Sequence, residues 1–216
     1  MATKYLGIDI GGTNVKMGIV EADSGNMTDF YSHDTAEWRK SGRFIERLGD
    51  AIAIQLKENP EVEKIGIGVP GLTSRDRTTL LEITAIPEIN GTRIAPILEE
   101  RLKGKKVYID NDANAAALGE YYFGEQGVPE DYIFVTLGTG VGGAAIIDKK
   151  VFKGGGGNAM EPGHVPSKHG RVLERNIGKV ELLELATQMR KEFKGVTRLT
   201  DNGSISTTGL VAAASD

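Results

Sequence analysis

The sequence predicts a protein of the α/β class, and three observations support that prediction. Short apolar runs rich in Val, Ile and aromatic residues, which are typical of strands, recur along the chain. Longer segments with an apolar residue at every third or fourth position, which are typical of helices, lie between them. Two strand pairs enclose glycine turns of the same type, at residues 9–14 and 137–143. The repeated unit of strand, glycine turn and strand indicates a duplicated half rather than an isolated hairpin.

The elements of the first half follow from apolar spacing and from turn residues. Five segments have the length and composition of strands: residues 5–10, 15–20, 28–34, 64–69 and 79–86. Two segments have helical spacing: residues 41–59 and 94–102. Pro60 and Gly104 end these helices, because proline lacks the N–H that a helix needs and glycine accepts the left-handed conformation after a helix. The dipeptide Pro70-Gly71 ends the fourth strand as a turn signal.

The second half continues the same alternation. Its expected elements are a strand at 106–109, a helix at 111–123, strands at 132–137 and 141–147, a helix at 179–193 and the start of a helix at 204. The glycine run at residues 154–157 is expected to form a mobile loop. We expect a domain boundary between the two glycine units. It divides the chain into a small N-terminal α/β domain over residues 1–115 and a partial, larger C-terminal domain over residues 116–216.

The composition argues against several classes of function. The 216 residues carry a formal net charge of −4, and no basic run exceeds Lys105-Lys106. Binding of nucleic acid is therefore not expected, because neutralised phosphates supply most of that affinity. The chain has no cysteine, hence no disulfide and no thiolate metal site. It shows no signal-peptide pattern and no apolar stretch long enough to span a bilayer, so we expect a cytoplasmic protein without membrane contact.

Each glycine turn is a candidate site for an anion. Glycine permits positive φ and has no Cβ, so that successive backbone N–H groups can point at a phosphate. The candidate residues are Gly11, Gly12, Thr13, Asn14, Gly138, Thr139 and Gly140. Because the two units match, we expect their loops to face each other across a cleft and to hold a polyphosphate. A plain hairpin stays an alternative. A dinucleotide fingerprint is disfavoured, because it needs a helix where residues 15–20 continue as a strand.

Acidic residues follow two of the expected strands. Asp9 lies just before the first turn, where a carboxylate beside phosphates suits Mg²⁺, and capping of the turn is its plain alternative. Asn111 and Asp112 open a helix, and N-capping explains one of the two. The functional interpretation is that Asp112 accepts the proton of an attacking hydroxyl. A helix N-terminus favours its ionised form and makes it a weak base, which the loose transition state of phosphoryl transfer tolerates.

Three further polar residues follow the glycine run of residues 154–157. Glu161 and His164 belong to the segment Glu161-Pro162-Gly163-His164, and Glu174 follows it. A single loop histidine is usually a surface or structural residue, and a glutamate at a helix start is usually solvated. Glu161 and His164 become candidates for substrate binding only if their loop folds over the same cleft as Asp112, which periodicity does not determine.

Four segments together resemble the ROK family (repressor, open reading frame, kinase), which groups bacterial sugar kinases with sugar-responsive repressors. The segments, in order, are Asp9-Ile10-Gly11-Gly12-Thr13, Gly68-Val69-Pro70-Gly71, Asn111-Asp112-Ala113-Asn114-Ala115-Ala116-Ala117-Leu118-Gly119-Glu120 and Leu137-Gly138-Thr139-Gly140-Val141-Gly142. The resemblance extends from the N-terminus to about Glu174. The helix-opening segment in combination with both glycine loops is a specific signal.

The resemblance implies the actin-like ATPase fold of hexokinases, a ribonuclease H-like fold with two α/β domains around a cleft. It implies a glucokinase-like sugar kinase that transfers the γ-phosphate of ATP to a sugar hydroxyl with Mg²⁺. The residue in the place of Asp112 is then the base. Asn111, Asp112, Glu161, His164 and Glu174 line the sugar, and the glycine loops hold the nucleotide phosphates. Relatives commonly form dimers, so a homodimer is expected.

The chain departs from the family pattern in several places. Many members have a Cys-x-Cys-x-x-x-x-Cys zinc loop after the Gly-His pair, whereas residues 165–174 are shorter and lack cysteine, so no zinc is expected. Pro162 stands in place of the usual isoleucine and stiffens the loop. Ala85 stands where a sugar-contacting asparagine is common. Members are also longer, so this chain is expected to lack C-terminal strands and to have an incomplete nucleotide site. A truncated, inactive form is therefore one expectation.

Two functions of different classes therefore stay open. The first is an ATP-dependent kinase for glucose, a similar aldohexose or an N-acetylhexosamine, with polyphosphate as an alternative phosphate donor. The second is a sugar-binding regulator or scaffold of the same family without catalysis. Family repressors carry an N-terminal helix-turn-helix, and the first strand here begins near residue 4, which disfavours a DNA-binding regulator.

Overall fold

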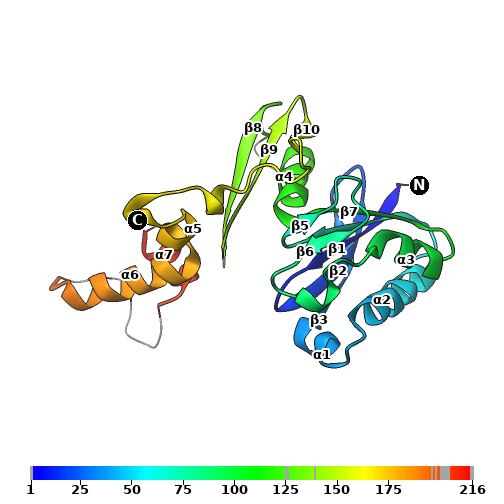
Figure 1. Ribbon diagram of the computed structural model, residues 1–216, viewed down its shortest axis with the longest axis horizontal. Helices are drawn as coiled ribbons and strands as arrows, with labels where there is room; N and C mark the ends of the chain where they lie inside the picture. The colour runs from blue at the N-terminus through cyan, green and yellow to red at the C-terminus, as the bar shows by residue number, and fades with distance from the viewer. Residues whose placement is uncertain are drawn as a thin grey trace. The chain divides into compact units, whose positions relative to one another are not determined.

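The computed structural model describes residues 2–124, 127–138, 140–195, 197, 199 and 205–214 (Figure 1). The chain divides into two compact units. The first comprises Met1–Phe134 with Ala144–Ala159, and the second Val135–Gly143 with Met160–Asp216. The boundary expected between residues 115 and 116 separates two lobes on either side of a cleft, which is a different division from these two units. That boundary stays a prediction.

A five-stranded mixed sheet forms the centre of the first unit, with the order β3-β2-β1-β4-β7. Its strands are β1 (Lys4–Ile10), β2 (Asn14–Glu21), β3 (Met27–Asp34), β4 (Val62–Val69) and β7 (Lys106–Asn111). β1, β2 and β3 pair antiparallel, whereas β4 is parallel to both β1 and β7. The carboxyl ends of β1, β4 and β7 therefore share one edge, where open α/β sheets generally bind ligands.

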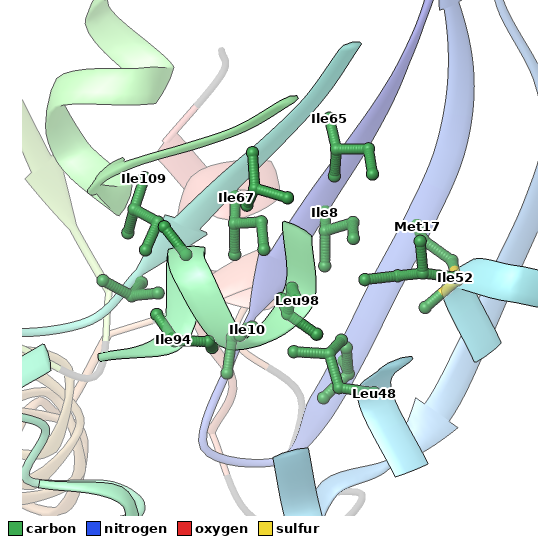
Figure 2. Close-up of a cluster of buried hydrophobic side chains, with 14 of the residues drawn as sticks. Ile8, Ile10, Met17, Leu48, Ile52, Ile65, Ile67, Ile94, Leu98 and Ile109 are labelled. Carbon is green, nitrogen blue, oxygen red and sulfur yellow. The ribbon is translucent and has the colours of Figure 1, made fainter. Parts of the chain in front are cut away.

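One face of this sheet carries the main hydrophobic core, covered by α2 (Phe44–Glu58) and α3 (Ile94–Arg101). Alternate residues of each strand point into it, as the two-residue period of a strand requires. Figure 2 shows the strand residues Ile8, Ile10, Met17, Ile65, Ile67 and Ile109 gathered against Leu48, Ile52, Ile94 and Leu98 of the two helices. Leu48 and Ile52 are fully buried. The core thus fixes the strand ends on which the candidate site is built.

The opposite face of the sheet receives the first turn of α4 (Asp112–Phe123). A Cβ on Gly68 of β4 would lie 3.6 Å from the Asp112 Cα and 3.7 Å from the Ala115 Cβ. These small residues let the helix approach the sheet closely. A smaller core joins α4 to a three-stranded sheet with the order β10-β9-β8, through Ala117, Ala144 and Ile146. Its strands are β8 (Tyr132–Leu137), β9 (Val141–Ile147) and β10 (Lys150–Val151).

The second unit contains the turn between β8 and β9 together with short helices. They are two 3₁₀ segments, Pro162–His164 and Lys168–Gly170, and the helices α5 (Glu174–Ile177), α6 (Lys179–Glu192) and α7 (Thr207–Ala214). No residue of α5 or α6 is buried, in contrast to the core helices of the first unit. Within the described residues, no helix is long and apolar enough to cross a membrane.

The elements differ from the expectations in a few places. The helix expected from residue 41 begins at Phe44, and α1 (Thr35–Lys40), capped by the Asp34 carboxylate, precedes it. The strand expected at 79–86 is only β6 (Leu80–Glu82), paired with β5 (Leu72–Thr73). α7 falls within the helix expected from residue 204, although residues 201–204, 215 and 216 lie outside the described part. Local patterns miss such short elements because tertiary partners decide them.

Candidate functional site

The first glycine turn joins the paired residues Ile10 of β1 and Val15 of β2. A Cβ on Gly11 would lie 2.9 Å from the Asn14 carbonyl oxygen, and a Cβ on Gly12 would lie 3.1 Å from the Ala85 Cβ. Neither glycine has positive φ. The turn therefore does not use the positive φ that glycine permits, and close packing is what favours glycine here.

The same turn is open on its outer side. Gly12 and Thr13 are exposed, and Asn14 is half-buried at the start of β2. The Gly11 N–H is already used, because it donates to the Asn14 carbonyl at 2.9 Å. The Gly11 and Thr13 carbonyls accept from the hydroxyl and the N–H of Thr35, at 2.7 and 2.9 Å. The turn is thus held from behind, while its exposed part remains accessible to an anion.

Three aspartates gather at the carboxyl ends of the parallel strands. Asp9 of β1 is in register with Gly68 of β4, and Gly68 is in register with Asp110 of β7. Residues in one register row share a face of the sheet, and this face is the one that α4 covers. Asp112, the first residue of α4, lies over Gly68 and is close enough for the Asp9 charge to act on its pKa.

Asn111 caps α4. Its Oδ1 accepts the N–H groups of Ala113 and Asn114 at 2.9 and 3.2 Å, and its Nδ2 donates to the Gly71 carbonyl at 3.2 Å. The capping expected for one member of the pair therefore belongs to Asn111, which leaves Asp112 available for other chemistry. One N–H of the Asn111 amide also remains for a ligand, since the group has two donors.

The pKa of Asp112 is raised above its ordinary value. Burial of the carboxyl is the main cause; the hydrogen bond from the Ala113 N–H, 2.8 Å long, acts against it, and the Asp9 charge adds to it. Asp112 as a whole residue is exposed, and the pKa follows the environment of the carboxyl itself. The expectation that the helix N-terminus would dominate is thus wrong, because desolvation and a like charge outweigh it.

In the second unit, Glu174 lies against the second glycine turn. Its Oε2 accepts the Val141 N–H at 3.0 Å. A Cβ on Gly140 would collide with this oxygen, and a Cβ on Gly163 would lie 3.4 Å from it. The turn itself is closed by a hydrogen bond from the Gly138 N–H to the Gly140 carbonyl at 2.9 Å. Thr139, a candidate phosphate-binding residue, lies outside the described residues.

Glu161 and His164, the two other polar candidates of this unit, lie on either side of Gly163, which packs near the Glu174 carboxylate. Pro162–His164 form a 3₁₀ turn in which the His164 N–H donates to the Glu161 carbonyl at 3.1 Å. His164 is exposed and Glu161 is half-buried. The structure thus joins the second glycine turn, the Glu161 segment and Glu174 within one unit. Asp112 belongs to the first unit, so a shared role with these residues stays a prediction.

Sequence reasoning missed a polar cluster beneath Asn111. The Asp110 carboxylate lies 3.3 Å from the Arg77 guanidinium and 3.4 Å from the Lys153 ammonium. Asn158 exchanges two hydrogen bonds with the Thr73 main chain, at 3.1 and 2.9 Å. The only sequence signal was the adjacency of Asp110 to Asn111. Nothing in local spacing connects Arg77, Lys153 or Asn158 to that position.

At Asp9, a divalent cation would need further ligands from a bound nucleotide. Within the described residues, no group of three His, Cys, Asp or Glu side chains could hold a metal ion. Asp9 and Asp112 form no ion pair with any described Lys, Arg or His, which leaves two neighbouring carboxylates without a cation. Mg²⁺ commonly binds through one or two carboxylates plus phosphate oxygens, so the Asp9 carboxylate suits Mg²⁺ brought with a nucleotide.

Comparison with known proteins gives the family. The ROK family profile matches residues 5–181. This chain belongs to the ROK family. It is 32% identical to a glucokinase of Thermotoga maritima over 162 residues, which are 75% of this chain and 50% of the relative. It is 39% identical to the xylose repressor of Caldicellulosiruptor bescii over 126 residues, 56% of this chain and 31% of that protein.

Solved structures agree with that assignment. A protein from Cytophaga hutchinsonii matches with a TM-score of 0.89 at 36% identity, covering 98% of this ROK chain and 70% of its own. A ROK family glucokinase from Streptomyces griseus, solved with glucose and AMPPNP, matches with a TM-score of 0.69 at 32% identity, covering 88% and 62%. The expected α/β, actin-like ATPase fold is thereby confirmed. The chain spans about half the length of the curated relatives it matches.

Proposed function

We propose that this ROK chain carries the catalytic part of a sugar kinase, which transfers the γ-phosphate of ATP to a hydroxyl of glucose or an N-acetylhexosamine-like sugar. The observation that carries the proposal is the pair Asp9 and Asp112 at the carboxyl ends of β1 and β4, with which no described basic side chain forms an ion pair. A reactive carboxylate with a raised pKa, set on the edge where α/β sheets bind ligands, suits general-base chemistry. Glucokinase relatives support the substrate class.

Asp112 acts as the general base in this proposal. It accepts the proton of the attacking sugar hydroxyl as the oxygen approaches the phosphorus of the transferred group. Its raised pKa makes it a stronger base than an ordinary aspartate, which favours proton transfer near neutral pH. The remaining Asn111 amide N–H orients the same sugar, because its other polar atoms are held by α4 and Gly71. ATP, when bound, supplies the phosphoryl group, and Mg²⁺ beside Asp9 balances the phosphate charge.

The remaining candidates complete this assignment. We assign the sugar hydroxyls to Glu161, His164 and Glu174, in addition to the Asn111 and Asp112 pair. The nucleotide phosphates are assigned to the two glycine turns, Gly11, Gly12, Thr13 and Asn14 in the first and Gly138, Thr139 and Gly140 in the second. A cytoplasmic location, a homodimer and the two lobes around a cleft belong to the same proposal.

A second candidate function is a sugar-binding regulator or scaffold without catalysis. The observation in its favour is the 39% identity to a protein named as a xylose repressor. Such a protein would keep the sugar contacts and lose phosphoryl transfer. The two functions therefore differ in whether a bound sugar is turned over, and polyphosphate stays an alternative to ATP as the phosphate donor.

A turnover screen distinguishes these possibilities. The chain is assayed with glucose, mannose, fructose, N-acetylglucosamine and N-acetylmannosamine, with ATP or polyphosphate as donor, and sugar phosphate is measured by mass spectrometry. We expect at least one product. Asp112→Asn should lower kcat by about 10²-fold or more, as the loss of a general base does. Asp50→Asn, a surface carboxylate paired with Arg101, serves as the matched control and should leave kcat unchanged.

The outcomes separate the two functions. Near-normal turnover by Asp112→Asn would remove this residue from the mechanism. Calorimetric sugar binding without any product would favour the regulator. Absence of both binding and product across the panel would reject a sugar-specific function for the chain as it stands.

A further inference from the structure

Arg77 occupies an unusual place in the first unit. It lies in the turn between β5 and β6 with a φ of 56°, a left-handed conformation that non-glycine residues seldom adopt. Its side chain is nevertheless only 11% exposed. A long, charged side chain in a surface turn normally stays in water, so burial of this one requires specific partners. The proposed kinase mechanism does not use Arg77.

The guanidinium of Arg77 connects three separate segments. It lies 3.3 Å from the Asp110 carboxylate at the end of β7, and it donates to the Gly157 carbonyl at 2.7 Å. It also donates to the buried Thr73 hydroxyl of β5. Asn158 adds a second tie, because its amide exchanges hydrogen bonds with the Thr73 main chain at 3.1 and 2.9 Å. The end of the glycine run is thereby held from two sides.

The backbone at Gly157 strongly favours glycine. Its φ is 91°, and a Cβ would lie 3.1 Å from the Arg75 Cα. The expected mobile loop of residues 154–157 therefore ends in a close, hydrogen-bonded contact with the β5–β6 turn. These contacts give the end of the glycine run a defined position relative to β7.

Asp110 carries the effect of Arg77 to the sugar-binding position. Its Oδ1 accepts the Asn111 N–H at 2.8 Å and the Asn114 Nδ2 at 2.8 Å. Asn111 is the cap of α4, and Asp112 is the first residue of that helix. The charge of Arg77 thus orients a carboxylate that in turn fixes the main chain just before the proposed base.

We propose that Arg77 is a positioning residue of the sugar site, which fixes the glycine loop of residues 154–157 to the Asp110–Asn111 end of β7. The planar fork of an arginine can reach a carboxylate, a carbonyl and a hydroxyl together, whereas the single ammonium of a lysine cannot hold all three in place. The link to sugar rests on the proposed function. The link that Arg77 makes between Gly157 and Asp110, called the tether below, rests only on the contacts of Arg77.

Two substitutions separate the tether from folding. Arg77→Gly removes the guanidinium and suits the left-handed backbone, so the β5–β6 turn should still form. Arg77→Lys keeps the positive charge near Asp110 and loses the fork. Arg75→Ala is the matched control, since it removes an exposed arginine from the same turn. Each variant of the 216-residue chain is examined by amide hydrogen exchange with peptide resolution, by thermal and urea denaturation, and by calorimetric titration with the five sugars named above.

In both Arg77 variants, exchange at residues 153–159 should rise about tenfold or more, the effect of losing hydrogen bonds to a charged group. Exchange in α2 should rise no more than the measured loss of global stability accounts for, and less than exchange at residues 153–159. Sugar affinity should fall about tenfold, and Arg75→Ala should change neither quantity. Partial recovery by Arg77→Lys in thermal stability but not in loop exchange would support the fork as the essential feature.

Unchanged exchange at residues 153–159 would overturn the tether. Faster exchange with unchanged sugar affinity would overturn the positioning role. A parent chain that binds none of the sugars would reject the proposed function and the positioning role with it, while the exchange measurement would still decide the tether on its own.

Discussion

Asp110 and Asp112 stand on either side of Asn111, and the protein surrounds the two carboxylates in different ways. Asp110 accepts two hydrogen bonds and has the cations of Arg77 and Lys153 within 3.4 Å. Asp112 accepts one hydrogen bond, from Ala113, and its charged neighbour is another acid, Asp9. The cations thus lie at the carboxylate that holds the backbone, and the carboxylate left without them has the properties of a functional group.

The contrast depends on burial as well as on charge. A partly buried carboxylate costs free energy unless it has partners. The side chain of Asp110 is 22% exposed, and it has both hydrogen-bond donors and cations as partners. At Asp112 the desolvation is not compensated, and the pKa rises as a result. Two residues of the same type, separated by one position, therefore have different environments, which suit a structural role for Asp110 and the proposed chemical role for Asp112. This division can be tested at each carboxylate separately.

The largest effect on stability is expected at Asp110. Asp110→Asn keeps the shape of the side chain and removes its charge, which leaves the mostly buried Arg77 without its anion. We expect the free energy of unfolding to fall by about 2 kcal/mol, the scale of a hydrogen-bonded charge that loses its partner. Urea denaturation at neutral pH measures the loss.

Asp50→Asn provides the matched comparison for this substitution. Asp50 also pairs with an arginine, Arg101, but their side chains are 56% and 42% exposed. An exposed pair contributes only about 0–1 kcal/mol, so this variant should lie close to the parent protein. Equal losses at Asp50 and Asp110 would mean that the Asp110 cluster is an ordinary surface ion pair.

Much of the fold could be predicted from the sequence, because its main elements have strong local periodicity. The strands on both sides of each glycine turn, and the helices α3, α4 and α6, lie where apolar spacing placed them. The errors are short elements. α1 depends on its Asp34 cap, and β5 with β6 depends on one small pairing. Periodicity over so few residues carries little information, so tertiary contacts decide these elements.

The site could be predicted only as far as chemistry follows chain neighbours. The cap was expected at one of the adjacent residues Asn111 and Asp112, and Asn111 is that cap. The reactive role of Asp112 stays a prediction. The network around Asp110 joins Arg77 and Lys153 from distant segments, and no local pattern reports such contacts. The direction of the Asp112 pKa was also out of reach, since it depends on burial and on Asp9 of another strand.

Substitution of Asp112 is expected to change the free energy of unfolding by less than Asp110→Asn does, and to raise it rather than lower it. Its pKa is raised in the folded state, so ionisation of this group is less favourable there than in the unfolded chain. Below its ordinary pKa of about 4 the group is protonated in both states and has no effect. As the pH rises through the raised value, the fold loses stability. Asp112→Asn cannot ionise and should therefore stabilise the protein at pH 7 by up to about 1 kcal/mol, after allowance for solvent screening.

Unfolding measured at pH 3.5 and at pH 7, without metal or nucleotide, tests this sign. The gain should be present at pH 7 and small at pH 3.5. Asp9→Asn should give part of the same gain, because the Asp9 charge contributes to the raised pKa of Asp112. A loss of stability in Asp112→Asn at neutral pH would show that the hydrogen bond from Ala113 outweighs desolvation, contrary to the order of effects inferred here.

The smallest effect on the free energy of unfolding is expected for substitution of Lys153. Its size shows whether Lys153 or Arg77 is the main cation that neutralises Asp110. The Lys153 ammonium lies 3.4 Å from the Asp110 carboxylate, but its side chain is 42% exposed, against 11% for Arg77. Water and salt screen an exposed charge, so Lys153→Met should cost less than about 0.5 kcal/mol, and less still at high salt. Urea denaturation at low and high ionic strength measures both values. A loss as large as that of Asp110→Asn would instead make Lys153 the main partner of Asp110 and would leave Arg77 with only its bonds to Gly157 and Thr73.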